Sequence, residues 1–401
     1  MSSAPQFDVA IAGGGIVGAA CALACARRGL RAALVERDAL GSGATAAGMG
    51  HIVVMDDSEA QFALTRYSQN LWRELAATLP PSAEYEQRGT LWIAADREEM
   101  GAAEKKQKWY SERSVHSEIL TAAQLATAEP NLAGGLAGAL LISQDAVVYP
   151  PVVALELARR AQHLGAQIVL GRSIRRLGNG VIELDDGAEV AAARIVLALG
   201  AESAQLAPHL PVRKRKGHLV ITDRYPGYVR HQLVELGYLK SAHSENGDSV
   251  AFNVQPRATG QILIGSSRQF GAEYPATDQH ILAAMLARAA VYMPRIRELS
   301  AIRVWTGFRA ATPDKLPLIG PDLNDPSLFL ATGHEGLGIT TSLATAELVA
   351  DHLTGRTLAI DAAPYLPARY AQHPTPGEPR RQEDNHAMDW SHAGAHHGIQ
   401  Q

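Results

Sequence analysis

Three glycines near the start of the chain have the spacing of a nucleotide-binding turn. Gly13, Gly15 and Gly18 form the pattern G-x-G-x-x-G directly after the apolar run QFDVAIA. In such a turn the first glycine bends the chain, the second lets a pyrophosphate approach the backbone, and the third lets a helix pack closely on the strand. The predicted chemistry is dinucleotide binding, with Ile16 and Val17 also beside the cofactor.

An acidic residue at the end of the second apolar run supports this interpretation. Glu36 lies 18 residues after Gly18, where RAALVE ends. A carboxylate at that place can accept hydrogen bonds from both ribose hydroxyls, and it would repel a 2′-phosphate, which argues against NADP. Arg37 follows Glu36 and is assigned to the same site. These residues do not separate NAD from FAD.

Two further glycine-rich segments favour FAD. The segment RDALGSGATAAGMGH has little side-chain bulk, which suits a loop that lies against a ligand. GHEGLGITT follows the apolar run SLFLATG and opens a predicted helix, whose positive end can face the flavin edge that becomes anionic on reduction. The other predicted cofactor residues are Gly43, Ala44, Thr45, Gly48, Met49, Gly50, Ile174, Ala198, Gly200, Gly333, His334, Gly336, Leu337, Gly338, Ile339 and Thr340.

The elements that must position these turns follow from the hydrophobic pattern. Apolar strands in QFDVAIA, AAARIVLALG and SLFLATG each end in small residues, as the carboxyl ends of one sheet around a long cofactor would. The predicted fold is α/β, with a discontinuous Rossmann-like FAD-binding domain and an α+β substrate domain built on an antiparallel sheet. The predicted FAD-binding segments are 1–85, 149–212 and 301–372, the substrate segments are 86–148 and 213–300, and 373–401 is a polar tail.

Composition excludes several classes of function. The 401 residues are 46% hydrophobic and 19% charged with a net charge of −4, which gives no case for nucleic-acid binding. The sequence has no apolar run of about 18 residues and no signal peptide, so we expect no transmembrane segment and a cytoplasmic enzyme. Cys21 and Cys25 are predicted to be buried, reduced thiols. The tail histidines His392, His396 and His397 are not expected to hold a metal.

The chain resembles a known family, the FAD-dependent amine and amino-acid oxidoreductases that include D-amino-acid oxidase, glycine oxidase and sarcosine oxidase. The segments that carry the resemblance are QFDVAIAGGGIVG, SGATAAGMG, RVWTGFRAATPDKLPLIG and ATGHEGLGITTSLATAELVA. Within the family, GMGHIVVMDD and GHEGLGITTS most resemble the flavin subunits of bacterial D-hydroxyproline and opine dehydrogenases. The resemblance implies noncovalent FAD, since Thr45 stands where some relatives attach flavin through a histidine.

The resemblance also implies a substrate site. Arg309, in the segment WTGFRAATP, matches the arginine that clamps the substrate carboxylate in glycine oxidase, although a structural ion pair with Asp314 is the alternative. Asn253 replaces a tyrosine of glycine oxidase, and Glu335 follows His334 where the pocket departs from that enzyme. Glu335 either holds a polar group of the substrate or is solvated. His51 either contacts substrate or is a structural histidine.

The predicted reaction is oxidation of the C–N bond of an amino acid or secondary amine, with hydride transfer to flavin N5. Substrates like D-proline or hydroxyproline, opines or glycine fit the resemblance. The alternatives are an oxidase that makes H₂O₂, a flavin subunit of an electron-transfer dehydrogenase with iron–sulfur or other redox partners, and an aromatic hydroxylase. The basic run RKRKGH, residues 213–218, is expected to be a solvated turn rather than a guide for anionic substrates.

Overall fold

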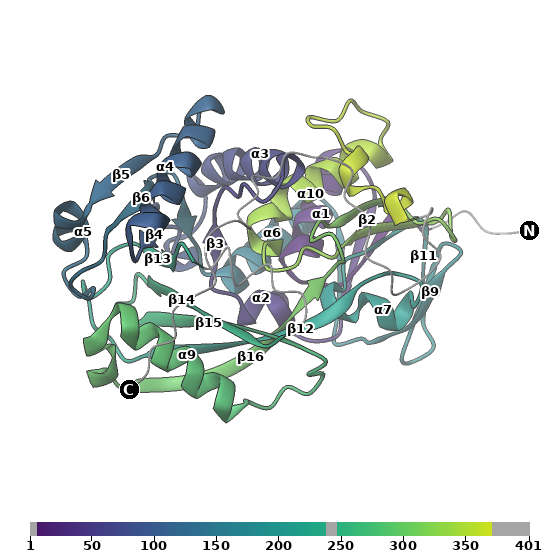
Figure 1. Cartoon of the computed structure of the whole chain (residues 1–401). Coiled ribbons are helices and arrows are strands. Elements are labelled where there is room, and N and C mark those ends of the chain that lie inside the picture. The colour runs from purple at the N-terminus through teal and green to yellow at the C-terminus, as the bar shows by residue number, and fades with distance from the viewer. Residues whose placement is uncertain (1–5, 238–246, 371–401) are drawn as a thin grey trace, which may run out of the picture.

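Two large sheets dominate the structure, a computed structural model that describes residues 6–237 and 247–370. Each sheet has eight strands, and β3 (His51–Ile52) pairs with β7 (Ala146–Val147) in a separate two-stranded ribbon. The short helix α2 (Gly43–Ala47) lies in the centre of the molecule, between the sheets (Figure 1). The predicted tail and its histidines lie outside the described residues.

The first sheet has the predicted parallel core. Its main order is β17-β18-β11-β1-β2-β8, with β17 antiparallel at one edge, and a hairpin pairs β10 with β11. Three separated segments of the chain supply these strands. They are β1 (Phe7–Ala12), β2 (Ala32–Glu36), β8 (Gln167–Leu170), β9 (Ile174–Gly178), β10 (Val181–Leu184), β11 (Glu189–Leu197), β17 (Leu318–Pro321) and β18 (Leu328–Thr332).

Helices rich in small apolar residues cover this sheet. α1 (Ile16–Arg27) packs between α6 (Pro150–His163) and α10 (Gly338–Leu353), and α3 (Glu59–Ala76) packs on α10. Because α1 consists mainly of alanine and cysteine, the neighbouring helices approach it closely and bury it almost completely. Cys21 and Cys25 are free and buried, as predicted.

The second sheet has the order β16-β12-β15-β14-β13-β4-β6-β5 and is antiparallel except where β13 pairs with β4. α9 (Gln279–Tyr292) packs on β14 and β15, and α4 (Arg97–Glu112) and α5 (Ala122–Ala128) pack beside β5 and β6. The strands are β4 (Thr90–Ala94), β5 (Glu118–Thr121), β6 (Gly138–Ile142), β12 (Arg213–Thr222), β13 (Gln232–Glu235), β14 (Ser249–Pro256), β15 (Ile262–Phe270) and β16 (Ala301–Ala311).

The basic run at residues 213–218 is not a solvated turn, so that prediction is wrong. It forms the first half of β12, and Arg215, Lys216 and His218 are buried there. Each of these side chains has a partner that is distant in sequence, which makes the burial of polar groups tolerable. β16, which the prediction placed in the 301–372 segment of the FAD-binding domain, pairs along β12 in the second sheet.

The alternation of side chains along β12 gives the second sheet two different faces. Arg215 and Gly217 lie opposite Arg309 and Gly307 of β16, so these four residues share one face. A Cβ on Gly307 would lie 2.4 Å from Cβ of Ala47, which shows that this face presses against α2. The opposite face of the sheet packs on α9.

No helix within the described ranges is long and apolar enough to cross a membrane. Within the same ranges, no group of three or more His, Cys, Asp or Glu side chains is arranged to hold a metal ion.

Candidate active site

The turns that follow β1, β11 and β18 meet at one edge of the first sheet, as predicted. These parallel strands are neighbours in the sheet, and each is followed directly by a small residue: Gly13, Ala198 and Gly333. The N–H of Ala198 donates to the carbonyl of Ala12 over 2.9 Å, and a Cβ on Gly13 would lie 2.7 Å from the carbonyl oxygen of Ala198. The carboxyl edge of the sheet therefore brings glycine turns from three distant segments together.

The N-terminal glycine turn is as tight as its spacing predicts. Gly13 has φ +105°, a conformation that favours glycine, and a Cβ on Gly18 would lie 1.8 Å from the carbonyl oxygen of Gly13. Gly15 caps α1 without a side-chain hydrogen bond, while Thr45 Oγ1 accepts the N–H of Ile16 over 3.0 Å. The next N–H groups of the helix, starting at Val17, have no partner within α1.

Glu36 lies beside this turn. Its carboxylate accepts the N–H of Gly14 over 2.7 Å and the N–H of Asp38 over 2.8 Å, so it is held at the end of β2. Arg37 pairs at the surface with Asp38 over 3.0 Å. Ile174, also predicted to be at the cofactor, is the first residue of β9, and its side chain packs against the core of the first sheet.

The small-residue loop contacts the start of α10. A Cβ on Gly48 would lie 2.6 Å from Cδ1 of Ile339, and the hydroxyl of Thr340 donates to the carbonyl of His51 over 2.8 Å. The carbonyl of Met49 accepts the side-chain N–H of Gln255, from the second sheet, over 2.6 Å. Gly43, Ala44 and Gly50 belong to this loop, which thus lies between α10 and the second sheet.

The C-terminal glycine turn brings a buried histidine and an uncapped helix to the same edge. Gly333 has φ +78°, and His334 is buried with Nε2 3.0 Å from the hydroxyl of Thr345. Burial lowers the pKa of His334 to about 4, so its ring is neutral at pH 7. Leu337 caps α10 without a side-chain hydrogen bond, which leaves the first N–H groups of the helix, from Gly338 on, without a partner in the helix.

Gly200 and Gly336 also lie at this edge. The carbonyl of Gly200 accepts the hydroxyl of Thr332, at the end of β18, over 3.0 Å. A Cβ on Gly336 would lie 3.5 Å from Nε of Arg309, so the C-terminal turn contacts the second sheet there.

Arg309 lies across the neighbouring strand of the second sheet. A Cβ on Gly217 would lie 2.5 Å from its Nη1, so the guanidinium occupies the place that a side chain at position 217 would take. Nη1 donates to the carbonyl of Ser267 over 3.0 Å. The proposed structural partner, Asp314, instead pairs with Arg369 over 2.6 Å. The position of Arg309, between β12 and the turn at Gly336, is consistent with a substrate clamp.

Glu335 is not a solvated side chain, so that alternative is wrong. It forms an ion pair with Arg215, and the side chains of both residues are at most 12% exposed. Glu335 has φ +53°, and its N–H donates to the carbonyl of Ala310 over 2.8 Å, which ties the C-terminal turn to β16. The guanidinium of Arg215 also lies 4.0 Å from the ring centre of Phe270.

Asn253 and His51 lie near the middle of the second sheet and its neighbouring loop. Asn253 is 8% exposed in β14, opposite Gly265, and its Oδ1 has no hydrogen-bond partner among the described residues. Burial lowers the pKa of His51 to about 4, with the side chain of Gln255 opposing the shift. The unpaired Asn253 carbonyl is a group that a substrate or cofactor can satisfy.

These features fit FAD. The N-cap residues of α1 and α10, Gly15 and Leu337, make no side-chain hydrogen bond, and the first turns of these two helices contain no acidic residue. Both N-termini can therefore face anionic groups. The first would hold the pyrophosphate and the second the flavin edge that gains charge on reduction. Glu36 would hold the ribose, and the segment from Gly43 to Gly50 would lie along the ring system.

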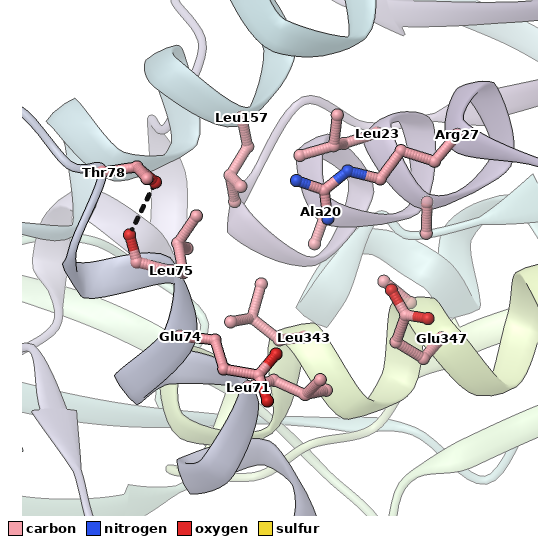
Figure 2. A pocket seen from close by; sticks show the side chains of 12 residues that line it. Ala20, Leu23, Arg27, Leu71, Glu74, Leu75, Thr78, Leu157, Leu343 and Glu347 are labelled. Atoms are coloured by element: carbon pink, nitrogen blue, oxygen red, sulfur yellow. Dashed lines mark hydrogen bonds between the residues drawn. The ribbon is translucent and has the colours of Figure 1, made fainter. Parts of the chain in front are cut away.

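A pocket lies elsewhere in the molecule, away from this edge. A cavity of about 240 Å³ lies among α1, α3, α6 and α10 (Figure 2). Leu23, Leu157 and Leu343 point into it, and Glu74 and Glu347 lie beside it. None of the predicted site residues lines this cavity.

Sequence reasoning missed three residues around Arg309. Arg215 pairs with Glu335, Gly217 leaves room for the guanidinium of Arg309, and the carbonyl of Ser267 accepts a hydrogen bond from that guanidinium. The signal that could have revealed the first two is the period of two in RKRKGHLV, where one face carries Arg215, Gly217 and an apolar residue.

Comparisons with known proteins agree with this geometry. Glycine oxidase of Geobacillus kaustophilus is 29% identical to this chain, in an alignment that covers 91% of this chain and 97% of the oxidase. The crystal structure of that oxidase superposes on this structure with a TM-score of 0.80 at 28% identity, and the superposition covers 90% of this chain and 98% of the oxidase chain. Hydrogen cyanide synthase subunit HcnC of Pseudomonas aeruginosa is 26% identical, covering 92% and 97%. An opine oxidase subunit of Rhizobium meliloti is 25% identical, covering 91% and 98%.

The family described as FAD dependent oxidoreductase (DAO) matches residues 8–352, which is most of the chain and includes both glycine turns. The protein therefore belongs to this family of FAD-dependent oxidoreductases.

Proposed function

We propose that the protein oxidises the C–N bond of a carboxylate-bearing amine, such as a proline-like, opine-like or glycine-like substrate. The observation that carries this proposal is the guanidinium of Arg309, which lies over Gly217 on the sheet face that presses against α2. A planar guanidinium with two N–H groups on one side matches a carboxylate in shape and charge. FAD, when bound, supplies the hydride acceptor.

The protein's own contribution is mainly orientation. Arg309 would hold the substrate carboxylate so that the Cα–H bond points toward the cofactor, and Asn253 would offer its unpaired carbonyl oxygen to the substrate amine. The amine must be neutral to release hydride, and a site with little water favours the neutral form. We assign no acid–base residue to this step, because loss of the amine proton on desolvation is sufficient.

The experiment that tests this function is an anaerobic titration of the FAD-loaded protein with D-proline, hydroxyprolines, opines, glycine and sarcosine. At least one of them should bleach the flavin absorbance. Arg309→Ala should weaken the binding of that substrate by on the order of 100-fold, because it removes a charge-assisted hydrogen-bonded pair. Arg303→Ala, an exposed arginine on the same strand, is the matched control and should change nothing. An Arg309→Ala variant with full affinity would refute the clamp.

We further propose noncovalent FAD and a redox partner subunit. Thr45 accepts a backbone N–H of α1 through its hydroxyl, a role that needs no bond to flavin. HcnC and the opine oxidase relative are both named as subunits of larger enzymes, which supports a partner for this chain. Acid precipitation should release all the flavin into solution, and co-expression with neighbouring genes should yield a stable complex that passes electrons to an acceptor other than oxygen.

A further inference from the structure

The hydrogen bond that fixes Arg309 arises from an irregularity in the sheet. The ladder between β12 and β15 is regular at Lys216 and at Val220, and its register shifts between them. In this interval the main-chain N–H of His218 donates to the hydroxyl of Ser267 over 2.9 Å. The carbonyl of Ser267 instead accepts Nη1 of Arg309 over 3.0 Å.

The ring of His218 holds the same hydroxyl. Its Nδ1 lies 2.9 Å from Oγ of Ser267, and its Nε2 lies 3.0 Å from the main-chain N of Asp278. A backbone N–H can only donate, so Nε2 must carry a lone pair and the proton must be on Nδ1. His218 is therefore neutral, fully buried, and donates to Ser267 through both its main chain and its ring.

We propose that Ser267, held by His218, is the positioning residue that aims the guanidinium of Arg309 at the substrate carboxylate. This inference rests on the proposed function of Arg309. Neither Ser267 nor His218 is proposed to touch the substrate. Their effect is to direct one N–H of Arg309 to a fixed acceptor, so that the other face of a long and flexible side chain points in a defined direction.

Removing the hydroxyl should redirect the hydrogen bonds. In Ser267→Ala, the buried N–H of His218 loses its acceptor, and the nearest replacement on the same residue is the carbonyl that Arg309 uses. A second donor at that oxygen should weaken and redirect its hydrogen bond with the guanidinium. Ser267→Thr keeps the hydroxyl and should restore the arrangement, and His218→Asn keeps a donor at about the place of Nδ1.

The test uses acetate and acetamide as probes, because they have nearly the same size and only acetate carries a charge. Each is titrated into the oxidised, FAD-loaded protein, and binding is followed by the change in flavin absorbance and by calorimetry. Thr222→Val is the matched control, since Thr222 is also buried in β12 and its hydroxyl also accepts a backbone N–H of β15. Thermal unfolding and flavin content are recorded for every variant.

In Ser267→Ala we expect acetate to bind about tenfold more weakly, with acetamide unchanged, while Ser267→Thr and Thr222→Val behave as the wild type. His218→Leu should match Ser267→Ala, and His218→Asn should be milder. Equal losses for acetate and acetamide, or a loss in Thr222→Val as large as in Ser267→Ala, would show a merely structural role and overturn the proposal. If Arg309→Ala weakens acetate but Ser267→Ala does not, only the positioning role fails. If Arg309→Ala leaves acetate binding intact, the clamp itself fails, and this inference with it.

Discussion

Substituting Gly217 by alanine should damage substrate binding without damaging the fold. The added Cβ would lie 2.5 Å from Nη1 of Arg309 and 3.0 Å from its Cζ, so the guanidinium must withdraw by about 0.9 Å to reach the 3.4 Å of an ordinary contact. The atom in the way is the far end of a flexible side chain, so relief by movement of Arg309 costs little stability. The φ of Gly217 is not left-handed, so alanine fits the backbone.

The expected magnitude is a fall in kcat/KM of on the order of 10- to 100-fold, because a displacement of about 1 Å in a residue that orients the substrate can cost about that much. Stability should stay the same or rise by roughly 0.5–1 kcal/mol, since glycine in a strand interior is destabilising relative to alanine. The assay is steady-state kinetics on the best substrate of the titration panel, together with urea unfolding.

Two comparisons make this prediction specific. Gly101→Ala in α4 adds a Cβ that meets nothing within 4 Å, so it should leave the kinetics unchanged. Gly217→Ala should have no further effect when Arg309 is already alanine, because the two changes act on one contact. Wild-type kinetics in Gly217→Ala, or an undiminished effect of that substitution in the Arg309→Ala background, would refute the reasoning.

Three other predictions concern the cofactor site and its ion pair. Gly18→Ala places a Cβ 1.8 Å from the backbone oxygen of Gly13, which cannot move aside. The substitution should lower the free energy of unfolding by about 3 kcal/mol or more and abolish flavin binding, as measured by urea unfolding and by the ratio of flavin to protein. Burial lowers the pKa of His334 to about 4 from about 6.5 in the unfolded chain, so between these pH values the unfolded chain binds one more proton than the folded chain. The contribution of His334 to stability is therefore complete above about pH 6.5 and should fall by about 2 kcal/mol by pH 5. In urea unfolding at pH 7 and pH 5, His334→Gln should remove this part of the pH dependence. Glu335→Gln leaves the buried Arg215 without its anion and should destabilise the protein by about 3 kcal/mol in the same assay, whereas replacing both residues by apolar ones should recover most of the loss.

The first sheet could be predicted because its signals are local. The run before Gly13, the strand from Glu189 to Leu197 and the strand before Gly333 are each apolar and each end in small residues, which is enough to place them side by side. Pairing of strands from distant segments then followed from the convergence of their turns on one cofactor.

The substrate side was harder, because its charged residues are buried by partners far away in the sequence. A run such as RKRKGH is usually solvated, and the anion that permits the burial of Arg215 is Glu335, 120 residues later. Asp314 lies only five residues after Arg309 in the sequence, yet it pairs with Arg369, because β16 carries Arg309 into the second sheet. Ion pairs of this kind depend on the register of strands, which composition does not reveal.

The helix caps explain why the chain has two glycine-rich turns and one cofactor. Four helices begin with a side chain that accepts a backbone N–H of the first turn, namely Ser58 of α3, Asp96 of α4, Thr121 of α5 and Asp278 of α9. The N-cap residues of α1 and α10 make no such bond, although Thr45 of the small-residue loop accepts the first N–H of α1. α6 also begins without a cap, but its first residue is Pro150, which has no N–H to satisfy. Because the N-termini of α1 and α10 lie at the carboxyl edge of the same sheet, a single anionic cofactor can satisfy the remaining N–H groups of both. On the proposed arrangement the second turn serves the other end of FAD, and no second nucleotide is required to explain it.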